Sequence, residues 1–193
     1  MSQNYPTLAA ALAPDKTSPS LVRACVIAFL GTLLLTASAK IQVPFWPVPM
    51  TMQTFAVLLL GAALGPRLGT ATVLLYLAEG AAGLPVFAGT PEKGLGLAYM
   101  AGPTGGFLAG FVPGAFIVGW LAERGWDRSV PRLFLAMLLG HTAIFACGVL
   151  WLSQLVGFDK AWAGGVAPFY VATLFKTALG ACLVPAAWRL IRR

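Results

Sequence analysis

Four long stretches of this chain contain no charged residue: Ala24–Ala39, Ile41–Pro66, Gly94–Ala122 and Leu133–Phe158. About 20 apolar residues in a helix cross the ~30 Å hydrocarbon core of a bilayer, and a helix satisfies its own backbone hydrogen bonds there. The whole chain is 59% hydrophobic and 10% charged, whereas soluble domains are about half apolar and about a quarter charged. These features predict an all-α membrane protein that sits in a lipid bilayer.

Apolar blocks separated by Gly, Pro and charged residues predict six transmembrane helices. They are expected at Leu21–Ser38, Thr51–Leu64, Leu68–Leu84, Thr104–Leu121, Leu133–Val156 and Val166–Leu190. The second block is short for a full crossing, so we expect a partly buried or broken helix there. Residues 21–193 then form a single six-helix domain. Residues 1–20 are expected to be a flexible cytoplasmic tail, because they lack the pattern of a cleaved signal peptide.

The distribution of basic residues predicts which end of the bundle faces the cytoplasm. With the N-terminus inside, each external loop carries a single basic residue, Lys40, Lys93 or Lys160, while nine basic residues fall on the cytoplasmic side. The positive-inside rule therefore favours cytoplasmic N- and C-termini. The net charge of +7 is explained by this topology, so binding to nucleic acid is not expected.

Three segments expected on the outer face are rich in Gly, Pro or aromatic residues: Lys40–Met50, Leu84–Gly102 and Phe158–Pro168. Polar loops would be enough for mere connection. Apolar aromatic residues such as Trp46 and Tyr99 suit either an anchor at the membrane interface or a lid over a pocket.

Two ionisable residues fall inside the predicted helices. Lys176 lies ten residues after Val166, or ~15 Å along the helix, which predicts a position near the middle of the membrane. A buried ammonium there should face protein or water and meet an anion. It can instead pair with Glu79 as an internal tie or snorkel to a surface. Glu79 in turn can pair with Lys176, bind a ligand N–H or reach the lipid headgroups.

One face of the last predicted helix carries an aromatic ring, a hydroxyl and a cation in succession. Phe169, Thr173 and Lys176 have i, i+4, i+7 spacing, which places them on one side of a helix. This stripe suits a ligand with an apolar body and a carboxylate. Gln53 adds an amide that can donate and accept, although a lone Gln can also simply join two helices.

The chain lacks the motifs of common enzymes and metal sites. It has no Walker motif, no GxSxG and no HExxH, so neither ATP hydrolysis nor a known hydrolase is predicted, and no cofactor is expected. His141, the sole histidine, is expected to be a helix–helix hydrogen-bond partner. Cys25, Cys147 and Cys182 have no metal-ligand spacing and are interpreted as small buried residues.

Small residues four apart allow close helix packing. They occur at Ala24 and Ala28, at Gly61 and Gly65, and at Gly106, Gly110 and Gly114. Most such pairs serve internal packing.

Four motifs in this order resemble the BioY family: PVPMTMQTF (Pro47–Phe55), GLPVFAG (Gly83–Gly89), AGPTGGFLAGF (Ala101–Phe111) and PFYVATLFKTAL (Pro168–Leu179). One such motif alone would be weak, but four at family spacing are specific. The resemblance extends roughly from Leu21 to the C-terminus.

This resemblance implies an S-component fold and a role in biotin uptake across the bacterial inner membrane, without chemistry on the substrate. An S component of an energy-coupling factor (ECF) transporter captures its vitamin at the outer face and works with a transmembrane coupling subunit and ATPase subunits. Some similar proteins occur without those partners, in which case self-association is an alternative. Ala24 and Ala28 resemble the motif through which S components dock on the coupling subunit.

The resemblance also implies a set of biotin-binding residues. Gln53 and Lys176 are the main candidates, since the biotin valerate is an anion and its ureido ring offers a carbonyl and two N–H groups. The other candidates are Thr173, Glu79, Phe169, Tyr99, Trp46 and Phe87. Many family members have Gly-Asp where this chain has Ala172-Thr173, so Glu79 is a hypothetical replacement for the missing acid.

Two other function classes compete with vitamin binding. An ion or proton channel or exchanger would use Glu79 and Lys176 as a relay, but it needs more inward polar residues than this sequence offers. A membrane enzyme needs a nucleophile beside a base, and only His141 is available.

Overall fold

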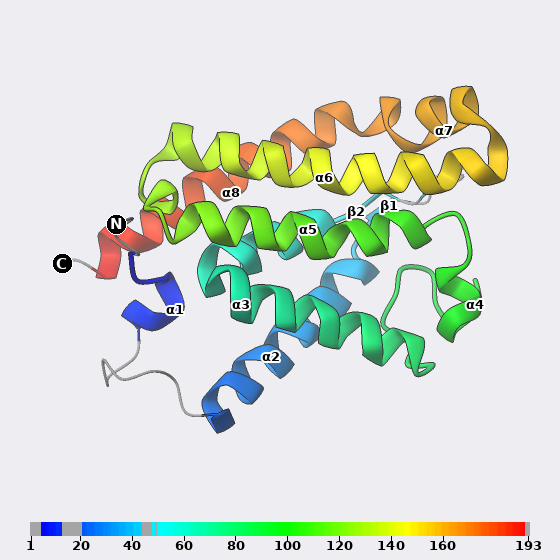
Figure 1. Cartoon of the computed structure of the whole chain (residues 1–193). Helices are drawn as coiled ribbons and strands as arrows, with labels where there is room; N and C mark the ends of the chain where they lie inside the picture. Colours follow the sequence, from blue (N-terminus) through cyan, green and yellow to red (C-terminus); the bar gives the residue numbers. More distant parts are fainter. Residues whose placement is uncertain (1–4, 13–20, 44–47, 49, 192–193) are drawn as a thin grey trace.

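The computed structural model describes residues 5–12, 21–43, 48 and 50–191, and it shows a helical bundle (Figure 1). Within these ranges, five helical segments are long and apolar enough to cross a membrane. They are α2 (Leu21–Lys40), α3 (Gln53–Ala81), α5 (Gly105–Ala122), α6 (Val130–Val156) and the continuous stretch Phe158–Ile191. That last stretch comprises α7 (Phe158–Gly165), η2 (Ala167–Phe169) and α8 (Tyr170–Ile191).

The segment α3 folds back on itself at Gly65 and Pro66. Gly65 has φ +81°, which only glycine adopts without strain, and Pro66 starts the second limb. A Cβ on Gly69 would lie 3.1 Å from the Cα of Gly61, whereas residues eight apart in a straight helix are ~12 Å apart. The limbs over residues 53–64 and 66–81 are therefore the predicted second and third helices, and the six-helix prediction is confirmed. The first limb is too short to cross the core, as expected.

Irregular segments gather at one end of the bundle, which we call the loop end. It holds the pair β1 (Gln42–Val43) and β2 (Met50–Thr51), the loop over residues 82–95, α4 (Gly96–Met100) and α7. The opposite end, called the terminal end, holds α1 (Leu8–Ala11), the α3 turn, η1 (Trp126–Arg128) and the C-terminus of α8 (Figure 1). The first and last described residues, Tyr5 and Ile191, thus lie at the same end of the bundle.

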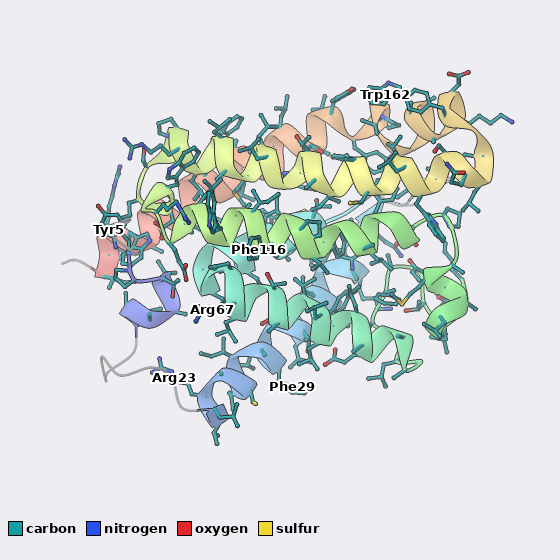
Figure 2. The ribbon with its side chains drawn as sticks, in the orientation of Figure 1. Tyr5, Arg23, Phe29, Arg67, Phe116 and Trp162 are labelled. Carbon is teal, nitrogen blue, oxygen red and sulfur yellow. The ribbon has the colours of Figure 1, made fainter. Side chains whose placement is uncertain are left out.

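Basic side chains mark the terminal end. Arg23 and Arg67 lie on that side in Figure 2, together with Tyr5. Arg124 and Arg128 belong to the α5–α6 connection at the same end. Large apolar side chains are exposed elsewhere on the surface, as Figure 2 shows for Phe29 on α2, Phe116 on α5 and Trp162 on α7. This division is the pattern of a multi-pass membrane protein.

Glycines let the central helices approach closely. A Cβ on Gly110 would lie 2.8 Å from the Cα of Ile144 in α6, and one on Gly61 would lie 2.5 Å from the carbonyl oxygen of Ala115 in α5. A Cβ on Gly106 would collide with Trp151. The prediction that these small-residue strips serve internal packing is confirmed. Around them lies a fully buried core of Val57, Leu58, Val118, Leu133, Met137, Ile144 and Leu152.

Part of the predicted N-terminal tail is packed on the bundle. The backbone N–H of Tyr5 donates to the carbonyl of Glu123 at 2.7 Å, and the Thr7 hydroxyl caps α1 through the N–H of Ala10. Residues 1–4 and 13–20 lie outside the described residues, so the boundary at residue 20 stays a prediction.

Two local expectations were wrong. Cys25 and Cys182 are exposed and Cys147 is half-buried, because small side chains are tolerated on the bilayer-facing surface as well as inside. The segment from Phe158, expected to be a loop, forms α7, so the last long helix starts at Tyr170 instead of Val166.

Candidate functional site

A small cavity at the loop end gathers most of the predicted binding residues. Its volume is about 50 Å³, and its walls come from β2, the loop over residues 82–95 and helices α3 to α8. Five predicted residues line it: Gln53, Tyr99, Phe169, Thr173 and Lys176. Ligand pockets usually measure about 300–1,000 Å³, so a vitamin-sized ligand would enter only after lining side chains move.

A larger hollow of about 500 Å³ lies between α6, α7 and α8 and is lined mostly by apolar side chains, with His141, Thr142 and Thr173 also in its walls. It opens between bilayer-facing helices and lacks Gln53 and Lys176. We place the site in the smaller cavity, because polar groups that fix a ligand converge there.

Lys176 ties α8 to the start of α3. Its side chain is 6% exposed, and its ammonium donates to the carbonyl of Thr51 at 2.6 Å and to the Thr54 hydroxyl at 3.4 Å. Because α8 starts at Tyr170, Lys176 lies ~9 Å along the helix from its start. It is therefore nearer the loop end than the predicted mid-membrane position.

Gln53 begins the first limb of α3 and is 4% exposed. Its amide nitrogen donates to the Tyr76 hydroxyl at 2.6 Å, and Tyr76 donates to the carbonyl of Val86 at 2.8 Å. The sequence reasoning missed Tyr76. The sequence offered one indication of its role: Tyr76 is a residue with a hydroxyl in an otherwise apolar stretch, and a buried hydroxyl needs a hydrogen-bond partner.

Phe87 lies behind the cavity wall. Its ring stacks on Tyr99 at a centroid distance of 5.1 Å and lies nearly perpendicular to the Tyr76 ring at 5.4 Å. Gly80 makes room for it, because a Cβ there would collide with the Phe87 ring. Phe87 thus supports Ala88, which follows it and lines the cavity.

Tyr99 in α4 lines the cavity and holds the same loop. Its hydroxyl donates to the carbonyl of Ala88 at 2.8 Å. Burial raises the pKa of the Tyr99 phenol, so the phenol keeps its proton and stays a donor at neutral pH.

Lys40 at the end of α2 also fastens the loop over residues 82–95. Its ammonium donates to the carbonyls of Phe87 and Thr90 at 3.2 and 2.9 Å, and to the Thr90 hydroxyl at 3.2 Å. The sequence reasoning counted Lys40 only as a charge in an external loop and missed this role.

Glu79 is not brought to the cavity. It accepts a hydrogen bond from the Thr32 hydroxyl at 3.0 Å, which joins the second limb of α3 to α2. Since Lys176 donates to Thr51 and Thr54 instead, the structure does not show the predicted Glu79–Lys176 pair. Trp46 lies outside the described residues.

The proposed docking pair on α2 is only partly accessible. Ala28 is 8% exposed, on the side of the buried Gly31, Thr32 and Leu35. Ala24 is half-buried. Phe29 and Leu33 are exposed on the other side of the helix.

The remaining polar candidate, His141, joins two helices as predicted. Its Nδ1 lies 3.0 Å from the Met137 carbonyl in α6 and 3.1 Å from the Thr177 hydroxyl in α8. Across the part of the chain that the structure describes, no group of three His, Cys, Asp or Glu residues is placed to hold a metal ion.

Comparison with known proteins agrees with this fold. The model of the BioY family matches residues 8–193. The probable biotin transporter BioY of Pyrococcus horikoshii is 42% identical over 149 residues, covering 77% of this chain and 86% of that protein. The biotin transporter BioY of Thermotoga maritima is 39% identical over 163 residues, covering 84% of this chain and 94% of its own.

A solved structure has the same fold. It is a crystal structure of the S-component for biotin from an ECF-type ABC transporter, with a TM-score of 0.74 and 24% sequence identity, and the match covers 91% of this chain and 96% of that chain. The family match spans nearly the whole chain, including every residue that lines the cavity. The chain is therefore a member of the BioY family.

Proposed function

We propose that this protein binds biotin in the loop-end cavity and serves as the substrate-binding subunit of a biotin uptake system. The observation that carries the proposal is the convergence of Lys176 and Gln53 on one cavity with aromatic walls. The names of the relatives from Pyrococcus horikoshii and Thermotoga maritima support biotin as the ligand.

The chemistry of the cavity suits the parts of biotin. Its carboxylate is an anion for the buried ammonium of Lys176, an interaction about twice as strong as a neutral hydrogen bond. Its ureido group can bond to the Gln53 amide and the Thr173 hydroxyl. Its apolar ring and chain would pack on Phe169 and Tyr99, as in most small-molecule sites. Glu79 would act only indirectly, through α2.

The loop end is proposed to face the outside of a bacterial inner membrane. The basic residues at the terminal end favour a cytoplasmic location for that end. Biotin would then arrive at the cavity from outside, and the loop over residues 82–95 would move to admit it.

We propose an ECF coupling subunit with its ATPases as the partner, with self-association as the alternative for a solitary protein. The helix α2 is the proposed docking helix, because little of it is covered by the rest of the protein. Of its 18-residue apolar stretch, 28% is buried inside the bundle, against 61% of the corresponding stretch of α5. As folded, Ala24 and the exposed Phe29 and Leu33 are better placed for contact than Ala28.

The channel hypothesis fits the geometry less well. It requires Glu79 and Lys176 to form one relay, yet Glu79 is bonded to Thr32 and Lys176 to Thr51. These contacts point to two separate structural ties.

Calorimetry on the detergent-purified protein tests the proposal. Titration with biotin should give tight one-site binding that an excess of thiamine or riboflavin leaves unchanged. A folded protein that releases no heat with biotin, or that binds all three vitamins alike, would contradict it.

A further inference from the structure

A chain of hydrogen bonds leads from the cavity to the loop that covers it. It starts at the Gln53 amide, passes through the Tyr76 hydroxyl and ends at the carbonyl of Val86. Gln53 lines the cavity, whereas Tyr76 is fully buried behind it. These hydrogen bonds therefore link a residue of the cavity wall to Tyr76 and Val86, which do not line the cavity.

The direction of each bond follows from the chemistry of the groups. A phenol has one proton, and the Val86 carbonyl can only accept, so Tyr76 donates to Val86 at 2.8 Å. The Tyr76 oxygen must then accept from Gln53 at 2.6 Å. Only the nitrogen side of the Gln53 amide can donate, so this network settles an orientation that atom positions alone leave ambiguous.

Because the amide nitrogen of Gln53 bonds to Tyr76, the amide oxygen of Gln53 points away from Tyr76. Its contact is a long one, 3.4 Å from the Thr51 hydroxyl, which leaves acceptor capacity for a ligand. Tyr76 itself cannot easily turn, because it is fully buried and the Phe87 ring packs nearly perpendicular to it at a centroid distance of 5.4 Å.

We infer that Tyr76 is a positioning residue that fixes the Gln53 amide, so that Gln53 presents its carbonyl oxygen to an N–H donor of the ligand. This inference rests on the proposed function. It assigns the Gln53 carbonyl oxygen to a ureido N–H of biotin, and it makes Tyr76 a determinant of that orientation although Tyr76 does not line the cavity.

A double-mutant cycle in the full-length protein tests whether Tyr76 acts through Gln53. Tyr76→Phe keeps the ring and should weaken biotin binding about 10-fold, the upper range for one hydrogen bond. Gln53→Met should weaken it at least as much. In the Gln53→Met background, Tyr76→Phe should have less than about a twofold effect. If the double variant instead lost affinity by the product of the two single losses, the inference would be overturned, and Tyr76 would act through the loop.

A second readout distinguishes positioning from a merely structural role. Two biotin analogues, each methylated on one ureido nitrogen, lose one N–H donor but keep the carboxylate. Wild-type protein should prefer biotin over one of them. Tyr76→Phe should reduce that preference and Gln53→Met should remove it. The control is Tyr99→Phe, which loses a bond to Ala88 but none to Gln53. It should weaken the binding of biotin and of that analogue by the same factor.

The outcomes separate the two proposals. If wild-type protein binds no biotin, the proposed function fails and takes this inference with it. If wild-type protein binds biotin and Tyr76→Phe weakens biotin and both analogues by the same factor, only the inference fails.

Discussion

The two ends of the bundle are closed in different ways. At the loop end, polar groups at the ends of long side chains form hydrogen bonds with the backbone of an irregular loop. Lys40, Tyr76 and Tyr99 each donate to carbonyls in the loop over residues 82–95. At the terminal end, short turns pack directly on helices. A Cβ on Gly119 would lie 2.5 Å from the backbone nitrogen of Pro66.

Two kinds of contact at the terminal end join side chains to each other. The Trp188 indole donates to the buried Asp127 carboxylate at 2.5 Å. The Arg128 guanidinium lies 4.5 Å from the Tyr5 ring centroid and 4.7 Å from that of Trp188, which is within range for cation–π contact.

This difference suggests a division of labour. A loop held by a few side-chain tips can open locally at low cost, whereas a close-packed turn opens only with the whole fold. Substitutions at the loop end should therefore change ligand binding, and substitutions at the terminal end should change stability.

The largest effect is expected for Lys176→Met, which keeps the volume but removes the charge. Losing a charge-assisted bond in a desolvated site should weaken biotin binding about 100-fold or more. Calorimetry checks this, with the exposed Lys160→Met as the control. Loss of affinity in both variants, or in neither, would contradict the role given to Lys176.

The matching test at the terminal end is Trp188→Phe. It removes a hydrogen bond to a buried carboxylate, which should cost about 1.5–3 kcal/mol of unfolding free energy. A lower melting temperature in detergent, with unchanged biotin affinity, is expected. Trp151→Phe at the loop end, where the indole donates to the neutral carbonyl of Gly102, should cost less. A large change in biotin affinity in Trp188→Phe would contradict the idea that the terminal end serves stability and the loop end serves binding.

Gly80→Ala should move Phe87 and the loop with it. The added methyl collides with the ring, and overpacking of this kind costs about 1–3 kcal/mol. Alanine favours a helix over glycine by about 1 kcal/mol, which offsets part of this cost. We therefore expect biotin binding to weaken about 10-fold, with a smaller fall in melting temperature than in Trp188→Phe. Ala78→Val, on the exposed side of α3, is the control. Unchanged binding in Gly80→Ala would show that Phe87 does not support the cavity.

The smallest effect is expected for Lys40→Met. It removes the bonds to Phe87 and Thr90, so the loop should open more often and biotin should dissociate about threefold faster. Stopped-flow measurement of the dissociation rate checks this. Lys93→Met, at an exposed lysine of the same loop, should leave the rate unchanged. An equal change in both variants would show that the Lys40 bonds to the loop do not slow dissociation.

Much of the fold follows from the sequence, because hydropathy and Gly-Pro breaks report directly on membrane helices. The break at Gly65 and Pro66 separated the two limbs of α3 correctly. The segment from Phe158 was misjudged, because its Gly-rich end resembles a loop while its first residues form the helix α7.

The site was predictable where one helix determines it. Thr173 and Lys176 share a face of α8, as periodicity predicts. Phe169 lies just before that helix in η2, and all three line the cavity. The position of Glu79 was not predictable, because its partner Thr32 depends on how α2 packs. Lys40 and Tyr76 were missed because they bond to loop carbonyls, whose path has no periodic signal in the sequence.

The central claim is that Lys176 binds the carboxylate of biotin, and a comparison of biotin with biotinamide tests it most directly. Wild-type protein should bind biotin about 100-fold more tightly than the neutral amide. Lys176→Met should bind the two with nearly equal affinity. A preference for biotin that survives in Lys176→Met would mean that another group reads the carboxylate, and the proposed orientation of the ligand would be wrong.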